Sequence, residues 1–173
     1  MKKLFLLFIA FICFNSFSQE AVNQKDTNGK KHGVWIVWLD KDWKLAKDSM
    51  SAVYYRYNYF INGRSMYPMG PMAGKLEANS NSKVKKGNAL QLDGEYKWYH
   101  KNGKVRFVNV LKNGWYVSYK EYRSDGTLES FFDYTEHDKD QQYSWAMYSY
   151  DKKGELKFKS FAYEEYGGKG VDN

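Results

Sequence analysis

The chain has 173 residues, a formal net charge of +7 and a single cysteine, Cys13. This length suits one domain or one short repeat array with enough residues to bury a core. One cysteine excludes an internal disulfide, and the basic residues are spread along the chain without a long block of like charges. The composition therefore favours a mildly basic surface over a nucleic-acid-binding stripe.

Residues 1–18 have the pattern of a secretory signal peptide. Lys2 and Lys3 precede an apolar run, and small residues lead up to a cleavage position after Ser18. The run is too short to cross a bilayer, which takes about 20 residues. Lipid attachment at Cys13 is disfavoured because Ile12 stands where that processing needs a small residue. We therefore expect an exported protein, periplasmic or at the cell surface, with no transmembrane segment.

Removal of this leader takes away Cys13 and lowers the formal charge from +7 to +5 by removing Lys2 and Lys3. The mature chain then has no thiol for a metal site or for nucleophilic catalysis. All 16 Tyr and all 6 Trp remain, whereas Leu and Ile are sparse. Tyr and Trp combine a large apolar area with a polar group, so they suit the half-buried face of a sheet.

After a linker at 19–27, residues 28–163 contain a repeated pattern in which an aromatic residue stands four positions before a turn residue. The turn residue is glycine in four copies and Asp42 in the first. The copies are WLDKDWKLAK (38–47), YFINGRSMYP (59–68), YHKNGKVRFV (99–108), YRSDGTLESF (122–131) and YDKKGELKFK (150–159). A second pattern, Gly-x-aromatic-x-x-aromatic, precedes several of them as GVWIVW, GEYKWY and GWYVSY, and without its glycine as YSWAMY.

The repeated pattern predicts β-hairpins. Its turns contain residue pairs that tolerate positive φ or tight turning, and an aromatic residue before the turn can pack on the returning strand, as Tyr99 would on Val105 or Phe107. The predicted turns are Asn62-Gly63, Asn102-Gly103, Asp125-Gly126 and Lys153-Gly154. Residues 95–99 alternate with period two, and no mature segment shows a helical period.

A lone hairpin is marginal in water, so successive hairpins must pair edge to edge. We expect an all-β, extended antiparallel sheet of hairpin repeats. Residues 64–93 interrupt the repeat with both prolines, Pro68 and Pro71, and a polar stretch, and they are predicted to form a long loop insertion. The end of the chain, 164–173, is predicted to be a flexible tail.

The stretch DGEYKWYHKNGKVRFVNVLKNGWYVSYKEYRSDGTLES resembles the bacterial variant of the MORN repeat, the type found in YwqK-family antitoxins. The resemblance is clearest over 93–134, weaker over 28–45 and faint over 143–163. It implies a twisted antiparallel sheet of hairpins that serves in scaffolding or binding. It supplies no catalytic residues, and an exported protein is badly placed to neutralise a cytoplasmic toxin.

Metal and catalytic chemistry find little support. Met66, Met69 and Met72 are spaced for thioether ligands of Cu(I), although flexible methionines would equally fill a gap between the sheet and its loop. No serine elbow or HExxH pair accompanies the three histidines. We therefore expect no enzyme activity and no cofactor.

Aromatic side chains at corresponding repeat positions are the candidate binding residues. An exposed stripe of rings would hold an envelope protein or stack on a glycan, and unpaired sheet edges would allow self-association. Alternatively, the rings pack on one another to form a thin core. The candidates are Trp35, Trp38, Trp98, Tyr99, Trp115, Tyr116, Tyr119 and Trp145.

Overall fold

The computed structural model describes residues 22–67, 74–80, 82–136 and 144–163. The described residues form strands and turns and no helix, and so no helix that could span a membrane. The all-β prediction is confirmed. The predicted signal peptide (1–18) and the tail (164–173) lie outside the described residues.

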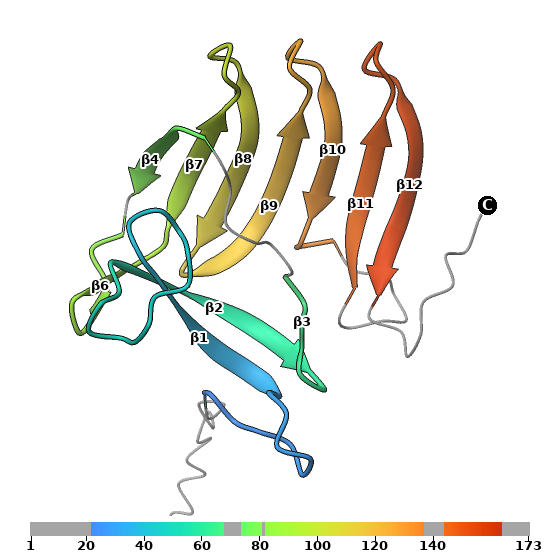
Figure 1. Ribbon diagram of the computed structural model, residues 1–173. Coiled ribbons are helices and arrows are strands. Elements are labelled where there is room, and N and C mark those ends of the chain that lie inside the picture. Colours follow the sequence, from blue (N-terminus) through green and yellow to red (C-terminus); the bar gives the residue numbers. More distant parts are fainter. Residues whose placement is uncertain (1–21, 68–73, 81, 137–143, 164–173) are drawn as a thin grey trace, which may run out of the picture.

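The large sheet is an antiparallel meander in the order β12-β11-β10-β9-β8-β7-β4. Its hairpins β7–β8, β9–β10 and β11–β12 stand side by side with their turns at the same end of the strands (Figure 1). This confirms the predicted series of hairpins paired edge to edge. The strands of the large sheet are β4 (Leu76–Ser80), β7 (Gly94–Tyr99), β8 (Val105–Lys112), β9 (Trp115–Tyr122), β10 (Leu128–Asp133), β11 (Ser144–Tyr150) and β12 (Leu156–Tyr163).

The small sheet has the order β1-β2-β6-β5, with β3 paired to β2. All of its pairs are antiparallel except β2 with β6, which is parallel. Its long strands, β1 and β2, cross beneath the β7–β9 end of the large sheet (Figure 1), and β2 contacts β9. The strands of the small sheet are β1 (Gly33–Leu39), β2 (Tyr54–Ile61), β3 (Arg64–Ser65), β5 (Lys85–Lys86) and β6 (Ala89–Gln91).

The segment 64–93 interrupts the hairpin series, as predicted, but it also contributes strands β3 to β6. β4 adds an edge to the large sheet by pairing with β7, and β6 pairs with β2 in the small sheet. These short strands satisfy backbone groups of two neighbouring sheet edges that a plain loop would leave unpaired.

Five turns share one backbone geometry. In each, the first residue's N–H donates to the fifth residue's carbonyl, and the fourth residue has positive φ, which is a type I turn followed by a G1 bulge. The five turns are 26–30, 40–44, 100–104, 123–127 and 151–155. Three of the four predicted turns belong to this set, and all four predicted turn glycines have positive φ.

The first repeat copy is corrected by one position. Trp43, and not Asp42, occupies the place that glycine takes in the other copies, with φ of 62°. The N–H of Asp40 donates to the carbonyl of Lys44 at 2.8 Å, as His100 does to Lys104, so Asp40 corresponds to His100. An aromatic residue with positive φ is strained, so its side chain must be held by its surroundings.

A two-residue turn at Asn113–Gly114 was not predicted. Both residues have positive φ, at 52° and 83°, which defines a type I′ turn between β8 and β9. Asn62–Gly63 forms the same kind of turn between β2 and β3. The glycine that opens the pattern GWYVSY is therefore the second residue of a hairpin turn.

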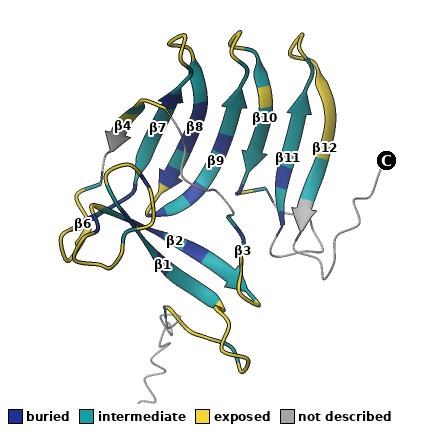
Figure 2. Cartoon of the chain, viewed as in Figure 1, coloured by how far each residue is buried: buried dark blue, intermediate teal, exposed yellow. Residues whose placement is uncertain are grey.

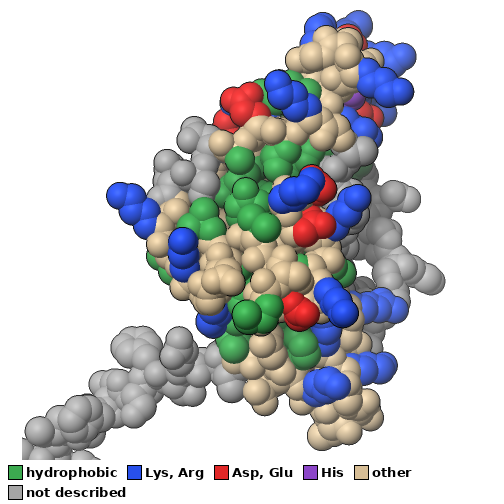
Figure 3. Space-filling view, turned by 60° about the vertical axis from the view of Figure 1, so that its left-hand side comes forward, with side chains coloured by type: hydrophobic (Ala, Val, Ile, Leu, Met, Phe, Trp, Pro, Cys, Tyr) green, Lys and Arg blue, Asp and Glu red, His purple; other side chains and the backbone are tan. Residues whose placement is uncertain are grey.

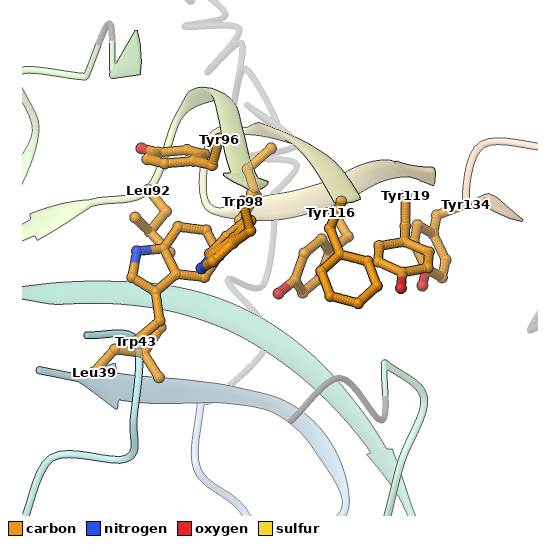
Figure 4. Packing of buried hydrophobic residues seen from close by; sticks show 10 residues of the cluster. Leu39, Trp43, Leu92, Tyr96, Trp98, Tyr116, Tyr119 and Tyr134 are labelled. Carbon is orange, nitrogen blue, oxygen red and sulfur yellow. The ribbon is translucent and has the colours of Figure 1, made fainter. Parts of the chain in front are cut away.

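The core lies between the two sheets and is made mostly of rings (Figure 2 and Figure 4). The prediction of one sheet is incomplete, because a single layer would leave one ring-covered face in water. The small sheet folds back and covers this face. The buried members of this main cluster are Leu39, Trp43, Leu92, Tyr96, Trp98, Phe107, Leu111, Tyr116, Tyr119 and Tyr134.

Candidate functional site

Three of the eight predicted binding rings are core residues: Trp98, Tyr116 and Tyr119 are buried. Trp98 lies edge-on to Trp43, with ring centroids 4.8 Å apart, and the rings of Tyr119 and Phe107 stack at 5.6 Å. Figure 4 shows these rings turned into the space between the sheets. Their position supports the alternative in which rings pack on one another, and it leaves them without a face for a ligand.

The other five predicted rings are partly exposed and do not form one stripe. Trp35 and Trp38 lie three residues apart on β1, so they point to opposite faces of the small sheet. Trp115 stacks on Tyr57 at 5.3 Å where the two sheets meet. The remaining two belong to the large sheet, with Trp145 on β11 and Tyr99 at the end of β7.

The methionine cluster is only partly described. Met66 is buried and its N–H donates to the carbonyl of Tyr59 at 2.9 Å, whereas Met69 and Met72 lie outside the described residues. These three residues therefore stay weak candidates for Cu(I), and no metal is predicted. Within the described ranges, no group of three or more His, Cys, Asp or Glu side chains is arranged to hold a metal.

The face of the large sheet opposite the core carries a row of two stacked rings with a lysine at each end, called the outer ladder here. Lys120, Phe131, Tyr148 and Lys159 are successive cross-strand neighbours on β9 to β12. The ammonium of Lys120 lies 5.3 Å from the Phe131 ring centroid, Phe131 stacks on Tyr148 at 5.4 Å, and Lys159 lies 5.1 Å from Tyr148. Cation–π and stacking contacts of this kind favour a flat, ordered surface.

Glu136 fixes one end of the outer ladder. Its carboxylate accepts hydrogen bonds from the Lys159 ammonium and from the Tyr148 hydroxyl. Lys159 and Tyr148 together hold the pKa of Glu136 below its usual range. The stability that ionised Glu136 contributes is therefore fully present above the ordinary pKa of a carboxyl group. It is lost as the pH falls through the lowered pKa of Glu136.

Strand β12 forms an open edge beside the outer ladder. Over the described residues it pairs only with β11, so the other side of this eight-residue strand presents unpaired backbone groups. Leu156 is 54% exposed and Phe158 is 48% exposed. A long edge with exposed apolar side chains is a ready template for a further strand.

The outer edge of β1 differs because other parts of the chain cover it. The N–H of Asn23 donates to the carbonyl of Val34 at 2.7 Å, and its side-chain oxygen accepts from the N–H of Ile36 at 2.9 Å. Further along, the N–H of Ala46 donates to the carbonyl of Trp38 at 3.0 Å. These contacts use backbone groups that an incoming strand would need.

The surface elsewhere is mixed. Figure 3 shows hydrophobic side chains reaching the surface in small groups, with Lys and Arg scattered around them. This view contains no broad field of one charge, which agrees with the even spread of basic residues in the sequence.

Comparison with protein-family models found no match, and neither did comparison with curated proteins or with solved structures. The resemblance to MORN-type repeats therefore stays a prediction.

Proposed function

We propose that this protein is an exported, non-catalytic interaction module that holds a protein partner in the bacterial cell envelope. The partner contributes an extended segment that pairs with the open edge of β12. The observation that carries this proposal is the eight-residue edge strand, paired on one side only among the described residues, with Leu156 and Phe158 exposed.

The physical basis is strand addition. Backbone hydrogen bonds to an open edge supply affinity, and side chains that alternate along the edge supply selectivity. Lys157 and Lys159 interrupt the apolar side chains of β12, and lysines on an edge oppose indiscriminate pairing. The edge therefore favours a partner strand with acidic side chains opposite the lysines.

The contacts of the outer ladder also favour partner binding at the β12 edge. These contacts tie β9 to β12 across four strands, so the edge belongs to a rigid face. A partner strand added to β12 would place its own side chains next to Lys159, which already contacts Tyr148 and Phe161.

The test is affinity purification of the tagged protein from crosslinked native envelopes, with Leu156→Asp and Phe158→Asp as edge variants. Matched controls come from exposed apolar residues elsewhere: Val84, which is 54% exposed, and Val53, which is 42% exposed, each changed to Asp. We expect a stoichiometric protein partner with the wild type and both controls, and its loss with the edge variants.

A partner retained by the edge variants would show that β12 is not the binding edge. Absence of any protein partner from well-recovered wild-type protein would contradict the function itself. If sedimentation instead shows a dimer that only the edge variants lose, the occupant of the edge is a second copy of this chain.

Glycan binding is the second candidate. The observation that favours it is that Trp35, Trp38, Tyr99, Trp115 and Trp145 keep part of their surface exposed. Such rings stack on sugars with little loss of conformational entropy. We expect envelope oligosaccharides to quench the tryptophan fluorescence, and Trp35→Ala to remove this quenching. Absence of quenching with the wild type would exclude glycan binding.

A further inference from the structure

A groove of about 670 Å³ lies along the small sheet, and its lining includes residues of β1, β2 and β3. Its size is within the usual range of small-molecule sites. The face of β1 and β2 that bears Val37, Arg56 and Asn58 contributes to its lining. Trp35 and Phe60 line one part, Trp43 and Leu45 another, and Tyr67 completes it from beyond β3.

Arg56 is the unusual residue of this groove because it is charged and only 5% exposed. Its guanidinium donates to the carbonyl of its neighbour Tyr57 at 3.3 Å and lies 4.9 Å from the ring centroid of Tyr116. Among the described residues, no carboxylate forms an ion pair with it within 4.0 Å. A buried cation ordinarily has an anionic partner, because removal of a charge from water is costly.

The residues around Arg56 do not neutralise it. Among the described residues, the groove is lined by two cationic side chains, Arg56 and Lys31, and by no Asp or Glu. Tyr67, Tyr116 and Tyr134 lie near the guanidinium, and burial raises the pKa of each, an effect that the charge of Arg56 partly opposes. These phenols are therefore neutral at pH 7 and supply no counter-charge.

Two further polar groups in the lining lack a partner. The side-chain oxygen of Asn58 and the indole N–H of Trp43 are buried and make no hydrogen bond to the part of the chain that the structure describes. The amide nitrogen of Asn58 donates to the Ser65 hydroxyl at 2.6 Å, which holds this side chain in place. Buried polar groups without partners are rare in folded proteins, and binding sites are among the places that keep them.

The rest of the groove is apolar and aromatic. The rings of Trp35 and Phe60 meet edge to face at 6.0 Å, and the Lys31 ammonium lies 4.6 Å from the Trp35 ring centroid. Such rings would cover the body of a flat or branched ligand, while a few polar groups would fix its orientation.

We propose that this groove binds a small organic carboxylate with an aromatic or aliphatic body. The carboxylate pairs with Arg56, whose planar guanidinium matches the two oxygens of a carboxylate, and the body lies against Trp35 and Phe60. Lys31, at the Trp35 end, adds a second positive charge to the field that attracts the anion.

The test uses two probes of nearly the same shape and different charge, 3-phenylpropanoate and its neutral amide, titrated into the purified protein by calorimetry. We expect the acid to bind with 1:1 stoichiometry and about tenfold or more tighter than the amide, as a charge-assisted contact predicts. Proton–nitrogen spectra should show shifts of the Trp43 indole and the Arg56 side-chain signals with the acid.

Three variants assign the effect to residues. Arg56→Gln should remove the preference for the acid, whereas Arg64→Gln, an exposed arginine of the β2–β3 hairpin, should retain it. Trp35→Leu should weaken binding of the acid and of the amide by the same factor, because it removes part of the aromatic lining and leaves the charge of Arg56 in place. Thermal melting establishes that each variant is folded.

Equal binding of acid and amide, or no binding of the acid at millimolar concentration, would overturn the proposal. A folded Arg56→Gln variant that still prefers the acid would do the same. If Arg56→Gln does not fold, the acid-to-amide ratio and the Trp43 and Arg56 shifts in the wild type decide the outcome. Loss of the protein partner at β12 has no bearing on any of these results, because the groove and that edge share no residue.

Discussion

Trp43 shows how one residue can serve two opposed requirements. The turn at 40–44 favours glycine at its fourth position, because φ there is 62°. The core favours a large ring here, because the centroid of the Trp43 ring lies 4.7 Å from that of Tyr96 and 4.8 Å from that of Trp98. Backbone strain of this kind costs about 1–2 kcal/mol, whereas loss of a buried tryptophan costs about 3–5 kcal/mol. Packing outweighs the strain.

We therefore expect Trp43→Gly to lower the free energy of unfolding by about 2–4 kcal/mol, despite the relief of backbone strain. Trp43→Phe should cost about 1 kcal/mol, because it keeps a ring and removes the unpartnered indole N–H. The control is Asn113→Gly, at an exposed position with φ of 52°, which should change stability by less than about 1 kcal/mol. Urea unfolding measures all three; a stabilised Trp43→Gly would refute this ordering.

The hairpins of the large sheet are joined at their turns by side chains as well as by strand pairing. His100 Nε2 lies 2.9 Å from the carbonyl of Tyr122, and the Asn102 amide donates to the carbonyl of Ser124 at 2.7 Å. Both contacts link the β7–β8 turn to the β9–β10 hairpin. Arg123 continues the series, since its guanidinium donates to carbonyls of Asp151 and Tyr150 in the β11–β12 hairpin.

Removal of the Arg123 guanidinium should loosen the last hairpin. Arg123 donates to three carbonyls, those of Leu128, Asp151 and Tyr150, at 2.8, 3.0 and 2.7 Å. We expect Arg123→Met to cost about 2 kcal/mol, and Arg123→Lys to restore little because an ammonium cannot span these acceptors.

Hydrogen exchange is the informative measurement for this variant, because protection should fall mainly in β11 and β12 and less in β7 and β8. Arg106→Met is the control, since Arg106 packs on the Phe107 ring at 4.6 Å within one hairpin. Uniform loss of protection across the large sheet would contradict a local role for Arg123.

Backbone hydrogen bonds join the small sheet to the β8–β9 turn at Gly114. Its carbonyl accepts from the N–H of Tyr57 at 2.8 Å, and its N–H donates to the carbonyl of Leu92 at 2.9 Å. A Cβ at this position would lie 2.9 Å from the Tyr57 ring and 3.3 Å from the Gln91 side chain. A larger residue at this position would therefore force the Tyr57 ring to shift.

Two glycine variants separate backbone strain from this contact. Gly103 and Gly114 have nearly the same φ, 81° and 83°, but a Cβ on Gly103 would meet nothing within 4 Å. Gly103→Ala should cost about 1–2 kcal/mol, and Gly114→Ala about 1–3 kcal/mol more, because it also forces Tyr57 away. Equal losses in chemical denaturation would show that Gly114 does not hold the sheets together.

The sequence by itself determined the strand class, most of the hairpins and their registers near the turns. Tyr96 and Trp98 share one face, as period-two alternation predicted, and Tyr99 lies opposite Val105, one of the two residues that the hairpin turn predicted near it. These features are local: turn residues with positive φ and alternating side chains act within a few residues of one another.

Only the tertiary structure decided which rings are buried and where the groove lies. Similar aromatic patterns occur in both sheets, so the sequence could not show that Trp98 is buried and Trp35 only partly buried. The alternation of Arg56 and Asn58 with tyrosines in YYRYNYF was a signal that polar side chains share one face of β2. That this face turns inward depends on the small sheet crossing the large one, a long-range contact that local propensity cannot specify.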